Sequence, residues 1–258
     1  MAASGWLSPA RAESVDSEII LLVDIVRPEL SNTEFSRLMD SYATTFTSNQ
    51  VLNSIQSGVY GRIAVSVMLF GGTSNQVVGI PWMSIGNSSQ AATFASLVRN
   101  LTRPSTFAYS DPGSALTAAT FSFGTETGGT SNGYESAAQI IEVASSSLPS
   151  SSMAASTAAS SANALASGVD LINAVALGNF SSSINSFYAA NVIGSSIDGV
   201  MPSISSSNFN GALASTVTGM LTESVQTGVA VSVTSVPEPS SLTGLLPATL
   251  LLLRRRRR

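Results

Sequence analysis

The feature that most constrains the fold is a series of continuous apolar segments that alternate with segments of helical periodicity. "EIILLVDIV" (residues 18–26) is apolar except for its first residue and Asp24, a pattern typical of a central strand covered on both faces. Three further runs share this character: "GRIAVSVMLFGG" (61–72), "AAQIIEVASSS" (137–147) and "VDLINAVAL" (169–177). Strands that alternate with helices predict an α/β fold, with a Rossmann-like doubly wound, mostly parallel sheet flanked by helices.

"NQVVGIPWMSI" (75–85) follows 61–72 after a short glycine-containing turn. A turn of this length joins antiparallel neighbours, so the segment is expected as an antiparallel edge strand. Trp82 lies in this strand, and we expect it to pack against the sheet.

Helix signals separate the strands. In residues 31–46, Ser31 and Glu34 have the spacing of a capping box, and the large apolar residues fall on one helical face. These residues are Phe35, Leu38, Met39, Tyr42 and Phe46. Asp111 and Pro112 begin another helix as its cap and first residue. Further helices are expected within 51–58, 89–101, 151–168, 184–194 and 207–225.

The composition excludes several kinds of chemistry. The chain has no histidine and no cysteine, which removes imidazole acid–base catalysis, thiolate metal sites and disulfides. Without the five terminal arginines, six basic residues stand against fifteen acidic ones, a net charge of −9. Such a surface repels nucleic acid, so we expect no nucleic-acid partner.

The chain ends in an apolar run followed by a cluster of arginines. Residues 240–253 would form a helix of about 21 Å, whereas a hydrocarbon core of roughly 30 Å needs about 20 apolar residues. The run is therefore short for a permanent span. A basic arm for nucleic acid is an alternative, but such arms are normally polar and solvated.

The tail resembles a PEP-CTERM sorting signal. The resemblance rests on three elements in order: Pro237, Glu238 and Pro239; the apolar run; and the cluster Arg254, Arg255, Arg256, Arg257 and Arg258. It implies an exported bacterial protein whose tail inserts transiently in the membrane and is processed by an exosortase-type enzyme. The domain plan is then a signal-peptide remnant (1–12), one domain (18–226), a linker (227–235) and the sorting tail (236–258).

Several body segments resemble the bacterial family called domain of unknown function 1194, itself similar to von Willebrand factor type A domains. They are "LLVDI", "GRIAVSVMLF", "QVVGIPWMSI", "GSALTAA", "IIEVASSS", "GVDLINAVAL" and "FYAANVIG", in family order. The most distinctive features are Asn173 and the pair Phe187 and Tyr188. The resemblance implies a Rossmann-like sheet whose site lies at the carboxyl ends of the strands.

In von Willebrand A domains, that edge often holds a metal-ion-dependent adhesion site. The resemblance places its first motif, Asp-x-Ser-x-Ser, at Asp24, Val26 and Pro28, so both serine oxygens are missing. The threonine position falls near Ser110, and the later aspartate position falls at Ser146. Mg²⁺ prefers six oxygen ligands in near-octahedral geometry, so we expect no metal and no cofactor.

Two details of this site stay open from sequence. Asp24 could cap its own loop or pair with Arg27, and a rebuilt metal site could use Glu29 or Asp111. Both alternatives depend on which side chains the fold brings together.

Three functions are compatible with these features. The first is a non-enzymatic binding domain of the cell surface or extracellular matrix, with a protein or polysaccharide partner. The second is an enzyme acting on envelope polysaccharide through carboxylates at the sheet edge, drawn from Asp24, Glu29, Asp111 and Glu142. The third is a purely structural relative. A facing carboxylate pair would favour the enzyme, and an exposed apolar or aromatic patch would favour binding.

Overall fold

Four parallel strands form the centre of the sheet in the computed structural model, which describes residues 12–27, 29–104, 109–209 and 211–235. All four are buried along their whole length: β2 (Glu18–Asp24), β3 (Ile63–Phe70), β6 (Gln139–Ser145) and β7 (Leu171–Leu177). The sheet order is β4-β3-β2-β6-β7-β8, with β9 also paired to β7. The predicted α/β fold with a mostly parallel sheet is confirmed.

The strands at the margins are shorter or more exposed. β4 (Gln76–Ile85) pairs antiparallel with β3 across a turn in which the Gly71 amide donates to the Asn75 carbonyl at 3.1 Å. The expected antiparallel edge strand is therefore confirmed. β8 (Gly194–Ser195) and β9 (Ile204–Ser207) both pair with β7, and β1 (Glu13–Val15) pairs with β5 (Tyr134–Ser136) in a separate two-stranded sheet. These four strands of two to four residues were not predicted, because they are too short to show an apolar period.

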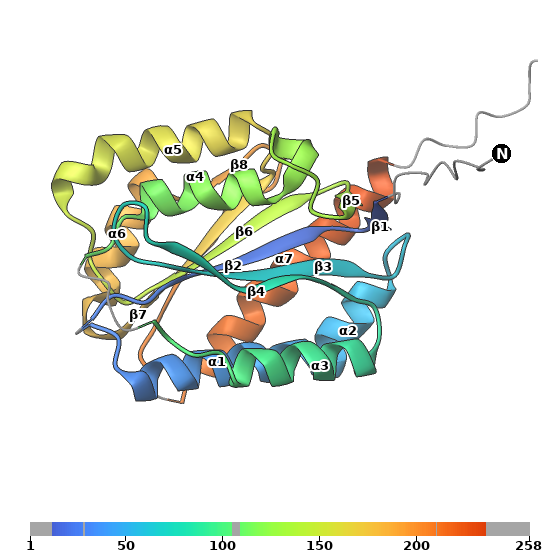
Figure 1. Cartoon of the computed structure of the whole chain (residues 1–258), viewed down its shortest axis with the longest axis horizontal. Helices are drawn as coiled ribbons and strands as arrows, with labels where there is room; N and C mark the ends of the chain where they lie inside the picture. Colours follow the sequence, from blue (N-terminus) through green and yellow to red (C-terminus); the bar gives the residue numbers. More distant parts are fainter. Residues whose placement is uncertain (1–11, 28, 105–108, 210, 236–258) are drawn as a thin grey trace, which may run out of the picture.

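Helices cover both faces of the sheet (Figure 1). One face carries α1 (Asn32–Phe46), α2 (Asn49–Gln56), α3 (Ser88–Arg99) and α7 (Leu213–Ser235). The other face carries α4 (Pro112–Ser122), α5 (Ala154–Ala166) and α6 (Ser181–Asn191). Three short 3₁₀ segments lie at Gly124–Thr127, Ser151–Met153 and Gly178–Phe180. Alternate residues of each central strand therefore enter two separate cores.

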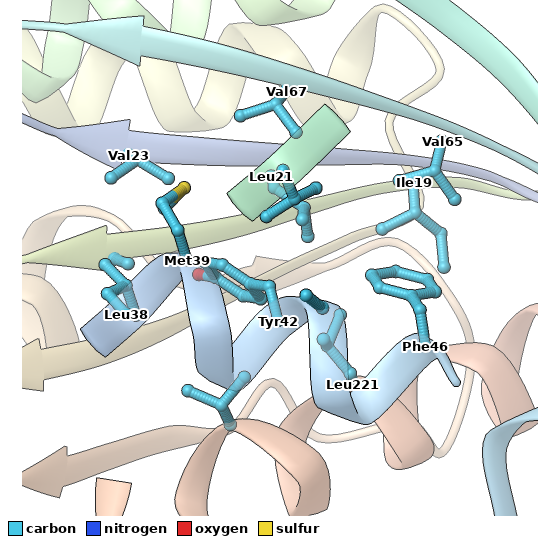
Figure 2. Close-up of a cluster of buried hydrophobic side chains, with 14 of the residues drawn as sticks. Ile19, Leu21, Val23, Leu38, Met39, Tyr42, Phe46, Val65, Val67 and Leu221 are labelled. Atoms are coloured by element: carbon cyan, nitrogen blue, oxygen red, sulfur yellow. The ribbon is translucent and has the colours of Figure 1, made fainter. Parts of the chain in front are cut away.

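The first core lies between the sheet and α1 (Figure 2). All five large apolar residues predicted for the inner face of α1 are buried, with Tyr42 and Phe46 fully inaccessible. They meet Ile19, Leu21 and Val23 of β2. Burial of a large apolar side chain contributes about 1.5–3 kcal/mol, so this layer is a major source of the domain's stability.

Local capping fixes where two helices begin. The Glu34 amide donates to Ser31 Oγ at 3.2 Å, and the Ser31 amide donates to Glu34 Oε2 at 2.8 Å, which completes the predicted capping box. These hydrogen bonds also lower the pKa of Glu34. Asp111 caps α4, as predicted, by accepting from the Ser114 amide at 3.0 Å.

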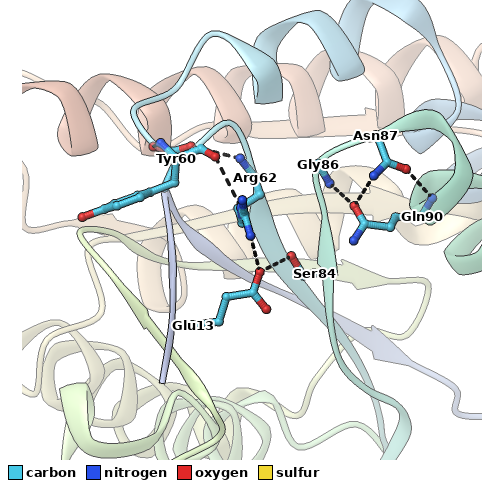
Figure 3. A network of polar contacts seen from close by, with 8 residues as sticks. Glu13, Tyr60, Arg62, Ser84, Gly86, Asn87 and Gln90 are labelled. Carbon is cyan, nitrogen blue, oxygen red and sulfur yellow. Dashed lines mark hydrogen bonds and ion pairs between the residues drawn. The ribbon is translucent and has the colours of Figure 1, made fainter. Parts of the chain in front are cut away.

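A polar network ties the amino end of the body to the sheet (Figure 3). Arg62 forms a 2.8 Å ion pair with Glu13, which also accepts from Ser84 Oγ at 3.1 Å. Nearby, the fully buried Asp16 accepts from the amides of Tyr60 and Arg62 at 3.0 and 3.2 Å. The segment before β2 is thus fixed to the start of β3.

Residues 227–235, expected as a linker, instead form the end of α7. Gly228 packs so closely on Ser17 that an added Cβ would lie 2.5 Å from the serine Cβ. Ser232 is buried and donates to Asp16 Oδ1 at 2.8 Å. The linker prediction was wrong because the contacts with Asp16 and Ser17, just before β2, stabilise a helix here. The local sequence of residues 227–235 has no clear helix signal.

Among the residues described, no helix has both the length and the apolar character that a membrane span requires. The predicted signal-peptide remnant (1–12), except for residue 12, lies outside the described residues. The predicted sorting tail (236–258) also lies outside them.

Candidate functional site

The candidate site lies where β2 and β6 separate at their carboxyl ends. β2 pairs with β3 on one side and with β6 on the other. The connection after β2 therefore leads to β3 on one side, and the connection after β6 leads to β7 on the opposite side. Open α/β sheets bind ligands in the crevice at such a switch point. Asp24 is the last residue of β2, and Ser145 is the last residue of β6.

Both carboxylate oxygens of Asp24 are already engaged. Oδ1 accepts from the Val26 amide at 3.0 Å, and Oδ2 accepts from Ser145 Oγ at 2.7 Å. Burial raises the pKa of Asp24 to about 6, although these hydrogen bonds and the neighbouring Ser110 act to lower it. Of the two roles considered for Asp24, the structure shows the cap on its own loop, whereas Arg27 donates to Asn32 Oδ1 at 2.9 Å.

Further hydroxyl groups surround this carboxylate. Tyr188 of α6 lies near it, and burial together with the charge of Asp24 raises the pKa of the phenol above its ordinary value. The Tyr188 hydroxyl is buried and has no hydrogen-bond partner in the part of the chain that the structure describes, and the buried Ser110 hydroxyl lies next to Asp24. The site is thus a small polar cluster with unused hydrogen-bonding capacity inside an apolar fold.

A guanidinium occupies the space in front of the β2 carboxyl end. Arg103 is only 9% exposed, and its Nη2 donates to the carbonyls of Ile25 at 2.7 Å and Val26 at 3.0 Å. Its Nε also donates to Ile25 at 3.2 Å. Burial, and then Arg27, lower the pKa of Arg103, but an arginine remains protonated at any physiological pH. A fixed positive charge therefore lies beside Asp24.

The residues at this edge do not fit a divalent cation. Val26 is buried and has no side-chain oxygen, and Pro28 lies outside the described residues. Asp111 is used as the α4 cap: burial acts to raise its pKa, but hydrogen bonds from Thr73 and Ser114 outweigh burial and lower it. Within the described ranges, no three His, Cys, Asp or Glu residues are grouped as a metal would need. Mg²⁺ would find too few oxygen ligands here, and the positive charge of Arg103 would make the electrostatic potential unfavourable for a cation.

The later motif position also differs from expectation. Ser146 was expected to face the site, but Ser145 makes the contact with Asp24, and the buried Ser146 hydroxyl has no partner among the described residues. Side chains alternate along a strand, so a shift of one residue moves the contact to the other face.

Glu142 lies away from the edge, in the middle of β6. Its carboxylate accepts from Ser224 of α7 and from Asn173 Nδ2 of β7, the latter at 3.3 Å. Burial raises the pKa of Glu142 to about 8. The expectation that Glu142 shares the sheet edge with Asp24 was wrong, because it points into the core beneath α7.

A pocket of about 340 Å³ opens above the Asp24 cluster. Its lining combines the apolar Val26, Leu148 and Met153 with Tyr109, three serines and the carboxylate of Glu29. Tyr109 and Leu148 are each 47% exposed. Mixed apolar and polar linings of this size are typical of small-ligand sites.

Sequence reasoning missed Arg103, Ser145 and Tyr188 as members of this site. Arg103 carries one usable signal, as it is the last basic residue before the tail and precedes Pro104. Tyr188 belongs to a distinctive segment, but nothing local indicates that it lies near Asp24. Trp82, by contrast, packs as predicted: its Nε1 donates to the Ser122 carbonyl at 2.8 Å, and its ring lies 5.5 Å from that of Phe123.

Comparison with solved structures shows the fold. The chain is similar to the pilus adhesin SpaC from Lactobacillus rhamnosus GG, with a TM-score of 0.55 and 11% identity over 84% of this chain and 30% of the adhesin. It is also similar to proximal thread matrix protein 1 from the mussel byssus, solved with a zinc-occupied MIDAS motif. That match has a TM-score of 0.53 and 14% identity, over 83% of this chain and 46% of the mussel protein.

A von Willebrand factor type A structure from Catenulispora acidiphila matches with a TM-score of 0.49 and 10% identity, over 83% of this chain and 43% of that one. The chain thus spans less than half the length of each of these proteins. Comparison with curated proteins found no match. The family model described as "Protein of unknown function (DUF1194)" matches residues 14–222, most of the chain, and the chain belongs to that family.

Proposed function

We propose that this chain is an exported protein of the bacterial cell surface or extracellular matrix, and that its domain binds a partner without catalysing a reaction. The observation that carries the proposal is the pocket above Asp24. It combines two half-exposed apolar side chains, Tyr109 and Leu148, with hydroxyl groups at the edge where open α/β sheets bind ligands.

The arrangement of carboxylates supports binding over catalysis. A glycosidase needs two carboxyl groups that face each other across a cleft. Asp24 and Asp111 are buried and hydrogen-bonded, and Glu142 lies in the core. Glu29 is the one carboxylate among the described residues that line the pocket. The missing histidine and cysteine point the same way.

The similarity to an adhesin and to a matrix protein supports the proposed setting, at the level of shared fold. The sorting-signal resemblance of residues 236–258 supports export, with an exosortase-type enzyme as the processing partner. In this proposal the loop after β2 needs no metal ion, because Arg103 supplies the positive charge beside Asp24 and holds the Ile25 and Val26 carbonyls.

The test is a pull-down from the matrix of the producing cell, with residues 12–235 as bait. We expect the bait to retain a partner that a Tyr109→Ala, Leu148→Ser double variant does not retain. The matched control is Val233→Ser on α7, which alters a residue that is 53% exposed and distant in sequence from the pocket. Equal capture by all three baits, or by none, would contradict the proposal.

A further inference from the structure

The pocket at the sheet edge has an aromatic ring held in a fixed position. The Thr73 amide donates to the Tyr109 hydroxyl at 3.2 Å. The Tyr109 hydroxyl in turn donates to Thr73 Oγ1 at 3.2 Å. The ring lies directly against Gly72, where an added Cβ would approach ring atoms to 2.8 Å. A side chain at position 72 would displace the ring from this position. Tyr109 therefore offers a positioned, half-exposed ring to the pocket.

Hydroxyl groups lie next to this ring. Ser110 and Ser147 line the pocket and are 4% and 3% exposed. The Ser110 hydroxyl lies close enough to Asp24 to lower the pKa of that carboxyl, whereas the Ser147 hydroxyl has no hydrogen-bond partner in the described part of the chain. A serine hydroxyl both donates and accepts, and a change of rotamer redirects it. Since a buried polar group without a partner costs free energy, a ligand that supplies a partner gains from Ser147.

The charge around the pocket selects among ligands. Glu29 is an exposed carboxylate in the lining, and Asp24 lies beneath it, close enough that Glu29 acts to raise the pKa of Asp24. In the part of the chain that the structure describes, no arginine lines the pocket, and Arg103 is turned to the carbonyls of Ile25 and Val26. Carboxylate, phosphate and sulfate groups are therefore disfavoured. A ligand that donates hydroxyl hydrogen bonds to a carboxylate is favoured.

We propose that this pocket binds a neutral sugar unit of a polysaccharide. One face of the sugar ring packs on Tyr109, while its hydroxyls donate to Glu29 and exchange hydrogen bonds with Ser110 and Ser147. An uncharged sugar has alternating C–H and O–H groups, which match the apolar ring and the hydroxyl groups of this lining. The inference rests on the proposed function, because it names the ligand class for the same site.

The experiment measures binding of the full chain to a panel of immobilised oligosaccharides. The panel contains neutral glucan, mannan and galactan oligomers, an acidic uronic-acid oligomer, and a lysine-rich peptide. We expect at least one neutral oligomer to bind and to be recovered intact. Tyr109→Ala should weaken that binding at least tenfold, and Glu29→Gln should weaken it by a smaller factor.

Two variants serve as controls. Tyr109→Phe keeps the ring on Gly72 and should retain most of the binding, which separates loss of the ring from loss of the fold. Phe121→Ala removes a ring that is 58% exposed on α4 and should leave binding unchanged.

Other results overturn the inference. Preferential binding of the acidic oligomer or the peptide would show that the ligand class is wrong, as would neutral binding that survives Tyr109→Ala. If no panel member binds while the pull-down still captures a partner through Tyr109 and Leu148, the sugar inference fails and the proposed function stands. If the pull-down also fails, the proposed function fails with it.

Discussion

Arg103 donates two hydrogen bonds to the carbonyl oxygen of Ile25, from Nη2 at 2.7 Å and from Nε at 3.2 Å. The same guanidinium also donates to the Val26 carbonyl. Buried backbone carbonyls in the loop after a strand need hydrogen-bond donors, because they no longer pair with a neighbouring strand. Arg103, in the segment after α3, supplies these donors. Its charge also compensates the buried carboxylate of Asp24. The Arg103 side chain therefore organises the loop after β2.

Replacing Arg103 should destabilise the domain. Arg103→Ala leaves the Ile25 and Val26 carbonyls without donors, and a buried charge-assisted hydrogen bond is worth about 1.5–3 kcal/mol. We expect the free energy of unfolding to fall by roughly 2–4 kcal/mol in a urea titration. Arg99→Ala is the control, because it removes an exposed ion pair with Asp40, worth about 1 kcal/mol at most. Equal losses for the two variants would contradict the role assigned to Arg103.

Stability should fall as the pH rises through the neutral range. The folded-state pKa of Glu142 is about 8, above the ordinary value of 4.5. The folded state thus holds a proton that the unfolded chain releases. Its stabilising effect is complete below pH 4.5 and is lost as the pH rises towards 8. Each pKa unit corresponds to about 1.4 kcal/mol, so the total is on the order of a few kcal/mol.

Glu142→Gln tests this pH dependence. The variant keeps a neutral, hydrogen-bonding side chain opposite Ser224 and Asn173, so thermal unfolding between pH 5 and pH 9 should show a flatter profile and greater stability at pH 8. Glu135→Gln changes an exposed carboxylate and should leave the profile as it is. A Glu142→Gln profile parallel to that of the wild type would contradict the assignment.

The end of α7 should contribute to the stability of the body. Ser232→Ala removes a donor from Asp16, a fully buried carboxylate, and should cost about 1–3 kcal/mol in chemical unfolding. Thr234→Ala, at an exposed position two residues later, should change little. If truncation after residue 226 left the unfolding midpoint unchanged, the contacts of this helix end with Asp16 and Ser17 would be irrelevant to stability.

Residues 236–258 should be absent from the mature protein. The prediction rests on the order of Pro237, Glu238, Pro239, the apolar run and the terminal arginines. Mass spectrometry of protein recovered from the native cell envelope decides it, with a C-terminal peptide that ends at or before residue 235 as the expected product. Mature protein that still carries the intact arginine cluster would contradict processing.

The parts of the fold that were predictable depend on local signals. Unbroken apolar runs indicate the buried strands, and the Ser31–Glu34 box and the Asp111 cap lie within four residues of what they stabilise. Asp24 was identifiable because it ends the most apolar strand. For such features, a short stretch of sequence contains all the interacting groups.

The rest depends on contacts between distant segments. Tyr188 and Asp24 are more than 160 residues apart in the sequence, and Arg103 reaches the β2 loop from 78 residues away. The apolar pattern alone could not show whether Glu142 lies in the core or at the sheet edge, because β6 is buried on both faces. The helical state of 227–235 likewise depends on its docking against Asp16 and Ser17.

The central claim is that the sheet edge works without a divalent cation, and thermal unfolding of residues 12–235 tests it most directly. A ligand that binds only the folded state raises the unfolding temperature as its concentration increases. With Asp24 hydrogen-bonded to Val26 and Ser145, and with Arg103 beside it, millimolar Mg²⁺ or Mn²⁺ should leave the unfolding temperature at its value in chelator. A saturable upward shift that disappears in Asp24→Ala would show that the edge holds a metal ion and would contradict the account.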